Sequence, residues 1–176
     1  MDGKNPAAPI FLIYELSLQE IESRRERLPK PMDSGVFKEG DDFKYFSFRD
    51  TENVKFKKED LIGKVLVLNF WFINCPPCKA EIPEFNEIVA EYKNNEKVVF
   101  VAVGLDEWVD VKEFIKNNPY NFHLVTGGRY IADDYGVNGY PTNIVVDTTG
   151  KIAFQSKGGS MANPLWIRKA IDKSLE

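Results

Sequence analysis

The 176-residue sequence contains few of the residues on which several classes of protein depend. It has only two cysteines, which excludes a scaffold built from several disulfides, so an apolar core must hold the fold. Its single histidine, His123, excludes any metal site with two histidine ligands. No apolar run reaches the roughly 18 residues that a membrane-spanning helix needs, and the longest extends from Val65 to Ile73.

Positive charge is not in excess either. Lys and Arg total 23 while Asp and Glu total 27, so the net charge is −4. A mildly acidic chain has no general attraction to nucleic acid or anionic lipid, and we expect no nucleic-acid partner. The N-terminus lacks the basic region, long apolar region and small-residue cleavage site of a signal peptide, which weakly favours a cytosolic location.

Hydrophobic residues make up 43% of the chain, enough for the core of one domain. Runs of β-forming residues predict strands, and apolar residues at a spacing of three and four predict helices. The predicted strands cover 43–48, 65–72, 98–104, 122–126, 142–147 and 152–157, and the predicted helices cover 78–92, 108–115, 129–135 and 162–175. Because strands alternate with helices and the last two strands form a hairpin, we predict an α/β fold with a central mixed sheet flanked by helices.

One further helix is predicted near the N-terminus. Ser17 and Glu20 have the spacing of a capping box, which predicts a short helix at about 18–28. The segment Pro29-Lys30-Pro31 ends this helix and begins a linker.

The two cysteines lie close together in Cys75-Pro76-Pro77-Cys78, between a predicted buried strand and a predicted helix. The first turn of a helix carries unpaired N–H groups and a partial positive charge, which lower the pKa of a cysteine thiol placed there. Two intervening residues let the sulfurs form a disulfide with little movement, and Pro76 suits the first helical position. We expect Cys75, nearer the exposed loop, to attack a substrate disulfide and Cys78 to resolve the mixed disulfide.

The same residues leave two other interpretations open, which are half of a metal site and an inert structural pair. A zinc site needs about four ligands, and Cys75, Cys78 and His123 are the only obvious soft ones. We therefore predict redox chemistry without a metal and without an organic cofactor.

The segment Asn-Phe-Trp-Phe-Ile-Asn-Cys-Pro-Pro-Cys-Lys-Ala-Glu-Ile-Pro, residues 69–83, resembles the active site of thioredoxin-fold proteins. It is most similar to the TlpA/ResA group of bacterial envelope thiol–disulfide oxidoreductases. Segments 63–68, 105–122, 140–142 and 147–151 resemble the lead-in strand, helical insert, cis-proline loop and hairpin turn of this group. The resemblance implies a thioredoxin-like domain over about 36–176, with an N-terminal β extension and a helical insert. Residues 1–35 are then an N-terminal extension that contains the short helix.

The resemblance also implies a function. It is dithiol–disulfide exchange on protein substrates, in the reducing direction, with electrons supplied by a membrane-linked partner. The implied location is the bacterial cell envelope or periplasm, with a targeting segment absent from this chain, while the cytoplasm stays open.

Further site residues follow from the resemblance. Glu81, three residues after Cys78, is expected to accept the proton that Cys78 loses. The Tyr140–Pro141 peptide is expected to be cis, with the backbone of Tyr140 pairing with the substrate chain. Together with Asn74 and Pro76, Tyr140 and Pro141 form the expected substrate-binding surface.

Two residues depart from the thioredoxin pattern. Asn74 stands where thioredoxin-like proteins usually have Trp, so substrate recognition and thiol pKa are expected to differ. Asn69 stands where thioredoxin has a buried Asp, and an amide cannot act as a base. Proton transfer is therefore expected to fall to Glu81 or to water.

Two alternative functions use a similar fold. Peroxiredoxins carry Pro and Thr or Ser seven and three residues before the peroxidatic cysteine, where this chain has Leu68 and Phe72. Copper chaperones of this fold bind through two cysteines and a histidine, here Cys75, Cys78 and His123, but they usually space the cysteines by three residues.

Overall fold

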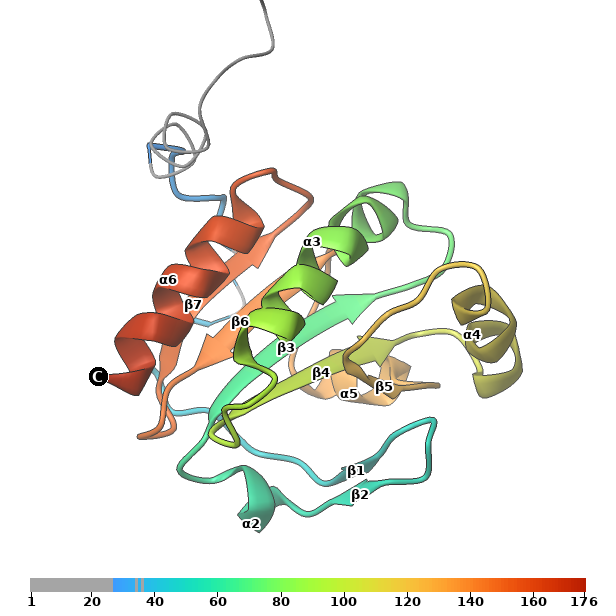
Figure 1. Ribbon diagram of the computed structural model, residues 1–176, viewed down its shortest axis with the longest axis horizontal. Helices are drawn as coiled ribbons and strands as arrows, with labels where there is room; N and C mark the ends of the chain where they lie inside the picture. The colour runs from blue at the N-terminus through green and yellow to red at the C-terminus, as the bar shows by residue number, and fades with distance from the viewer. Residues whose placement is uncertain (1–26, 34, 36) are drawn as a thin grey trace, which may run out of the picture.

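The computed structural model describes residues 27–33, 35 and 37–176, and a five-stranded sheet forms its centre (Figure 1). The sheet has the order β5-β4-β3-β6-β7. Its strands are β3 (Val65–Trp71), β4 (Val98–Gly104), β5 (His123–Val125), β6 (Thr142–Val146) and β7 (Ile152–Lys157). Within this sheet β3, β4 and β5 run parallel, whereas β6 is antiparallel to both β3 and β7. The predicted mixed sheet is therefore confirmed.

Helices cover both faces of this sheet. Helices α3 (Pro76–Tyr92) and α6 (Asn163–Leu175) lie side by side on the face nearest the viewer in Figure 1. The other face is covered by α5 (Arg129–Asp134), α2 (Lys58–Leu61) and the hairpin of β1 (Phe48–Arg49) and β2 (Lys55–Phe56). Helix α4 (Trp108–Ile115) belongs to the predicted insert and packs through Val111 on the α3 side. Because both faces are covered, every residue of β3 is buried, as its continuous apolar sequence requires.

The predicted strand over 43–48 is wrong for most of its length. Only Phe48 lies in a strand, the short β1, which pairs with the unpredicted β2. Phe43 instead donates its N–H to Gly150 O (2.8 Å) and stacks on the ring of Tyr135. The aromatic rings of this segment contact one another and the ring of Tyr135, which follows α5, and Phe43 to Ser47 are not paired in a strand.

The described part of the N-terminal extension is attached to the domain. Trp166 Nε1 donates to Leu28 O (3.2 Å), and the backbone N–H of Lys157 at the end of β7 donates to Met32 O (3.0 Å). The predicted helix at 18–28 lies almost wholly outside the described residues. Among the helices of the described part of the chain, none is long and apolar enough to cross a membrane.

Candidate active site

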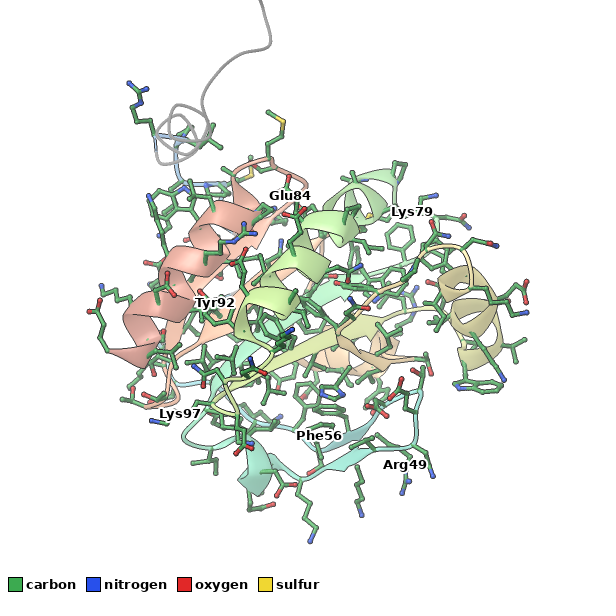
Figure 2. All side chains as sticks on the ribbon, viewed as in Figure 1. Arg49, Phe56, Lys79, Glu84, Tyr92 and Lys97 are labelled. Atoms are coloured by element: carbon green, nitrogen blue, oxygen red, sulfur yellow. A yellow bond between two sulfur atoms is a disulfide. The ribbon has the colours of Figure 1, made fainter. Side chains whose placement is uncertain are left out.

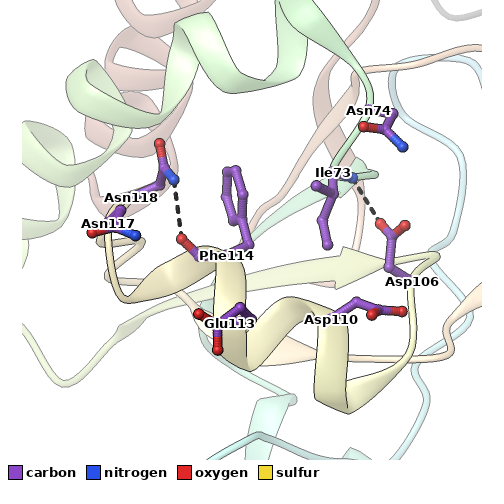
Figure 3. Close-up of a pocket in the computed structure, with 8 residues that line it drawn as sticks. All are labelled: Ile73, Asn74, Asp106, Asp110, Glu113, Phe114, Asn117 and Asn118. Carbon is purple, nitrogen blue, oxygen red and sulfur yellow. Dashed lines mark hydrogen bonds between the residues drawn. The ribbon is translucent and has the colours of Figure 1, made fainter.

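The loop between β3 and α3 is held by hydrogen bonds on both sides. Asp106 lies just after β4, and its Oδ2 accepts the N–H of Ile73 (2.7 Å). Within the loop, the N–H of Cys75 donates to Phe72 O (3.2 Å). Figure 3 shows the Ile73–Asp106 bond at the edge of a groove of about 440 Å³ beside this loop. The groove is lined by Ile73, Asn74, Asp106, Asp110, Glu113, Phe114, Asn117 and Asn118. Asn74, a predicted substrate contact, is exposed and belongs to this groove.

Cys75 and Cys78 are joined in a disulfide at the N-terminus of α3, with a Cα–Cα distance of 5.3 Å. Cys75 is the N-cap residue, and its Sγ accepts the N–H of Cys78 (3.3 Å). Because Pro76 and Pro77 have no N–H, the Cys78 amide is the first helix donor that can reach the sulfur. The same bond and the helix dipole favour a thiolate at Cys75 after reduction.

Exposure does not distinguish the two cysteines in this oxidised state. Cys75 is 3% exposed and Cys78 is 2% exposed, so the prediction that Cys75 is the more exposed is not confirmed. The two prolines between them, Pro76 and Pro77, are exposed. The predicted division of labour between the cysteines then has its support in the position of Cys75 at the helix terminus.

The cis-proline loop lies beside the strand that leads to the cysteines. The Tyr140–Pro141 peptide is cis, as the resemblance implies. The ring of Tyr140 packs edge-on against Phe72, with centroids 5.4 Å apart. This contact lies where the start of β6 meets the end of β3. Phe70 of β3 and Thr142 of β6 are also paired in register there.

Glu81 is the one buried glutamate of α3, with 6% of its surface exposed. Its Oε1 accepts from Asn163 Nδ2 (2.5 Å) and from the N–H of Ser160 (3.1 Å), and its Oε2 accepts from Asn143 Nδ2 (3.4 Å). Burial raises the pKa of the Glu81 carboxyl from 4.5 to about 7, against the opposing effect of these three donors. A carboxyl that titrates near neutral pH suits a group that exchanges protons with thiols.

The amides that surround Glu81 extend into the sheet. Asn69 on β3 and Asn143 on β6 are paired in register, and Asn69 Nδ2 donates to Asn143 Oδ1 (2.8 Å). Asn69 Oδ1 accepts from the hydroxyl of Tyr120 (3.0 Å), and all three side chains are buried. Asn69 is therefore connected to Glu81 through one intervening residue, Asn143.

Sequence reasoning missed Asn143, Asn163 and Ser160. Asn143 could have been noticed in the sequence, since it is a polar residue inside a run predicted to form a buried strand. Nothing in the sequence marks Asn163 and Ser160 as site residues, because polar residues near the start of a helix are ordinarily caps or loop residues.

His123 lies outside this constellation. Its Nδ1 is 2.8 Å from Asp50 Oδ2, and its ring packs against Phe56 with centroids 4.6 Å apart. Figure 2 places Phe56 at one end of the protein and Lys79, the residue after Cys78, towards the other. Within residues 27–33, 35 and 37–176, no three His, Cys, Asp or Glu side chains are arranged to hold a metal ion.

A family model and several curated relatives match this chain, and they agree with one another. The sequence model of the AhpC/TSA family matches residues 40–155. The chain is 36% identical over 115 residues to the thiol-disulfide oxidoreductase ResA of Bacillus thuringiensis (strain Al Hakam), covering 64% of this chain and 66% of that relative. The match thus spans just under two thirds of that relative's length. To the ResA of Halalkalibacterium halodurans the chain is 31% identical over 129 residues, covering 72% of this chain and 73% of that relative.

Solved structures show the same fold. A protein of Chlorobium tepidum described as a thiol:disulfide interchange protein DsbE superposes with a TM-score of 0.71 at 29% sequence identity. The superposition covers 80% of this chain and 99% of the Chlorobium chain. The thioredoxin-like fold and the resemblance to the ResA group are therefore confirmed.

Proposed function

The chain belongs to the AhpC/TSA family, and on this premise we propose that it is a thiol–disulfide oxidoreductase that acts on protein substrates through Cys75 and Cys78. One observation supports this most directly: the Cys75–Cys78 disulfide occupies a helix N-terminus, where Cys78 N–H bonds to Cys75 Sγ. The names of the ResA relatives support the same activity.

The proposed reaction has two exchange steps. The Cys75 thiolate attacks one sulfur of a substrate disulfide, forming a Cys75–substrate disulfide and releasing the other substrate sulfur as a thiolate, which takes up a proton. The Cys78 thiolate then attacks Cys75 Sγ, forming the Cys75–Cys78 bond and releasing the second substrate sulfur. The substrate disulfide gains two electrons and the protein dithiol loses two. This sequence leaves the protein with a disulfide between Cys75 and Cys78, and the geometry of the two residues in the structure accommodates that bond.

We assign the neighbouring residues to proton transfer and substrate binding. Glu81 accepts the proton of Cys78, because it is buried one helical turn further along α3. The backbone of Tyr140 at the cis peptide pairs with the substrate chain, and the exposed Asn74 and Pro76 form the rim that the substrate meets.

The direction and setting of the reaction are part of the same proposal. We propose that the protein acts as a reductant in the bacterial cell envelope or periplasm and receives electrons from a membrane-linked donor, by analogy with the resembled group. The catalytic unit is the domain at 36–176, and residues 1–35 are its extension.

Reduction of insulin by a thiol donor tests the activity. We expect Cys75→Ser to abolish turnover, and Cys78→Ser to accumulate mixed disulfides with protein substrates, because the second step is then missing. Wild-type protein alkylated in its reduced form is the control and should behave like Cys75→Ser. A wild-type protein that neither reduces insulin nor equilibrates with glutathione would contradict the proposal.

A further inference from the structure

A row of buried polar side chains runs across the sheet, and its middle member, Asn143, contacts Glu81 on α3. Asn69 of β3, Asn143 of β6 and Ser156 of β7 stand opposite one another in the strand register. Asn143 is 1% exposed and Ser156 is fully buried. Polar residues in the interior of a sheet are costly unless they are hydrogen-bonded, and here each has a partner in the row.

The hydrogen bonds in this row all point the same way. The Tyr120 hydroxyl donates to Asn69 Oδ1, Asn69 Nδ2 donates to Asn143 Oδ1 (2.8 Å), and Asn143 Nδ2 donates to Glu81 Oε2 (3.4 Å). Because the carbonyl oxygen of Asn143 is occupied by Asn69, only its NH₂ group is left to face Glu81. Asn143 therefore presents a donor of fixed orientation to the carboxylate.

We propose that Asn143 is a positioning residue for the exchange reaction: held by Asn69 within the central sheet, it fixes the orientation of the Glu81 carboxylate, which lies on α3 one helical turn after Cys78. This inference rests on the proposed function.

The other oxygen of Glu81 is fixed from a different direction. Asn163 Nδ2 donates to Glu81 Oε1 and also to Gly158 O (3.1 Å), so its orientation is set by the backbone of the loop between β7 and α6. The carboxylate thus has donors from β6 on one oxygen and from the start of α6 on the other. Loss of the Asn143 donor leaves Oε2 without its bond to the sheet while Oε1 stays bound.

Few charges act on Glu81 besides these dipoles. Glu84 on the same helix disfavours its ionised form. Tyr120 interacts electrostatically with it from the loop before β5, but burial keeps the phenol neutral by raising its pKa well above 10. The groups that bond it from β6, from the loop between β7 and α6 and from α6 are the neutral Asn143, Ser160 and Asn163. In the oxidised protein the cysteines carry no charge. Removing the Asn143 donor therefore shifts the balance towards protonated Glu81.

Direct titration of Glu81 tests the proposal independently of activity. The carboxyl carbon of Glu81 is followed by ¹³C NMR against pH in the oxidised protein, and the rate of thiol alkylation against pH is measured in the reduced protein. The variants are Asn143→Leu, which keeps the volume and loses the donor, and Asn143→Ser, which is smaller and too short to reach the carboxylate. The matched control is Gln155→Leu. Gln155 directly precedes Ser156 on β7, and its buried amide side chain lies on the opposite face of the sheet, where it bonds to the backbone of Phe37.

We expect both Asn143 variants to raise the titration midpoint of Glu81 by about 1 pH unit. This is the lower end of the effect of one lost hydrogen bond to a charged group, because the bond is long (3.4 Å). The alkylation profile should move in the same direction, and Gln155→Leu should leave both unchanged. An Asn143 variant that folds and titrates like the wild type overturns the proposal, as does an equal shift in Gln155→Leu. If the midpoint moves but wild-type protein fails to reduce insulin, the link between Asn143 and Glu81 stands and the proposed function is contradicted.

Discussion

Burial of the Glu81 carboxyl predicts that the oxidised protein loses stability as the pH rises from 4.5 to about 7. The pKa of this group is 4.5 in the unfolded chain and about 7 in the folded protein. Below pH 4.5 the carboxyl is protonated in both states, and its contribution to stability is complete. Above pH 4.5 the unfolded chain ionises while the folded protein keeps its proton, so stability falls until the pH passes about 7.

The magnitude follows from the two pKa values. They differ by about 2.5 pH units (7 − 4.5), and each unit corresponds to about 1.4 kcal/mol, so the loss is on the order of 3 kcal/mol. A loss of this size is a large fraction of the stability of an ordinary domain, which is roughly 5–15 kcal/mol.

Urea unfolding of the oxidised protein at a series of pH values between 4 and 8 measures this loss. The comparison is with Glu81→Gln, which cannot ionise. Glu81→Gln places an NH₂ group among the donors of Asn143 and Asn163, so we expect a roughly constant cost at every pH. The difference in unfolding free energy between the two proteins should still change by about 3 kcal/mol across the series, in favour of the variant at high pH.

Glu87→Gln, which removes an exposed carboxyl from the same helix, is the matched control. Its difference from the wild type should not follow the same course. The reasoning is refuted if the wild type and Glu81→Gln give parallel curves from pH 4 to 8, because Glu81 would then titrate alike in the folded and unfolded states.

Two further predictions concern the surroundings of the site. A Cβ on Gly159 would stand 2.5 Å from Pro77 Cβ, so Gly159→Ala should displace the loop that contacts the cysteine motif. The variant should be destabilised by about 1–3 kcal/mol and should reduce insulin more slowly. An unchanged thermal midpoint and an unchanged rate would argue against this contact. Tyr120→Phe leaves Asn69 Oδ1 without its donor, so the free energy of unfolding measured in urea should fall by about 1–3 kcal/mol. The control Tyr130→Phe, at an exposed ring, should leave that free energy almost unchanged. Equal effects of the two variants would show that the buried hydroxyl of Tyr120 contributes little.

Much of the fold could be predicted from local sequence. The apolar run from Val65 predicts a strand buried on both faces, and the structure forms β3 there. Pro76 suits the first turn of a helix, and α3 begins with it. These features depend on side-chain periodicity and on the backbone limits of proline, which act over a few neighbouring residues.

The aromatic segment near Phe43 shows where local reasoning fails. Alternating aromatic residues are typical of a strand, but a strand also needs a partner, and the neighbour of Phe43 is the turn at Gly150. Propensity for a strand describes a fit to a half-buried, paired surface, so the three-dimensional neighbours decide whether one forms.

Short sequence patterns identify the residues that could carry the chemistry: the cysteine pair at a strand–helix junction, a glutamate one turn further, and a proline directly before a late strand. The protonation state of that glutamate depends instead on residues far away in the chain. Its burial and its partners Asn143 and Asn163 come from β6 and α6, 62 and 82 residues further along the chain. The physical reason is that burial and hydrogen bonding depend on which strands and helices meet in space, and β6 meets β3 and α3 only when the sheet is complete.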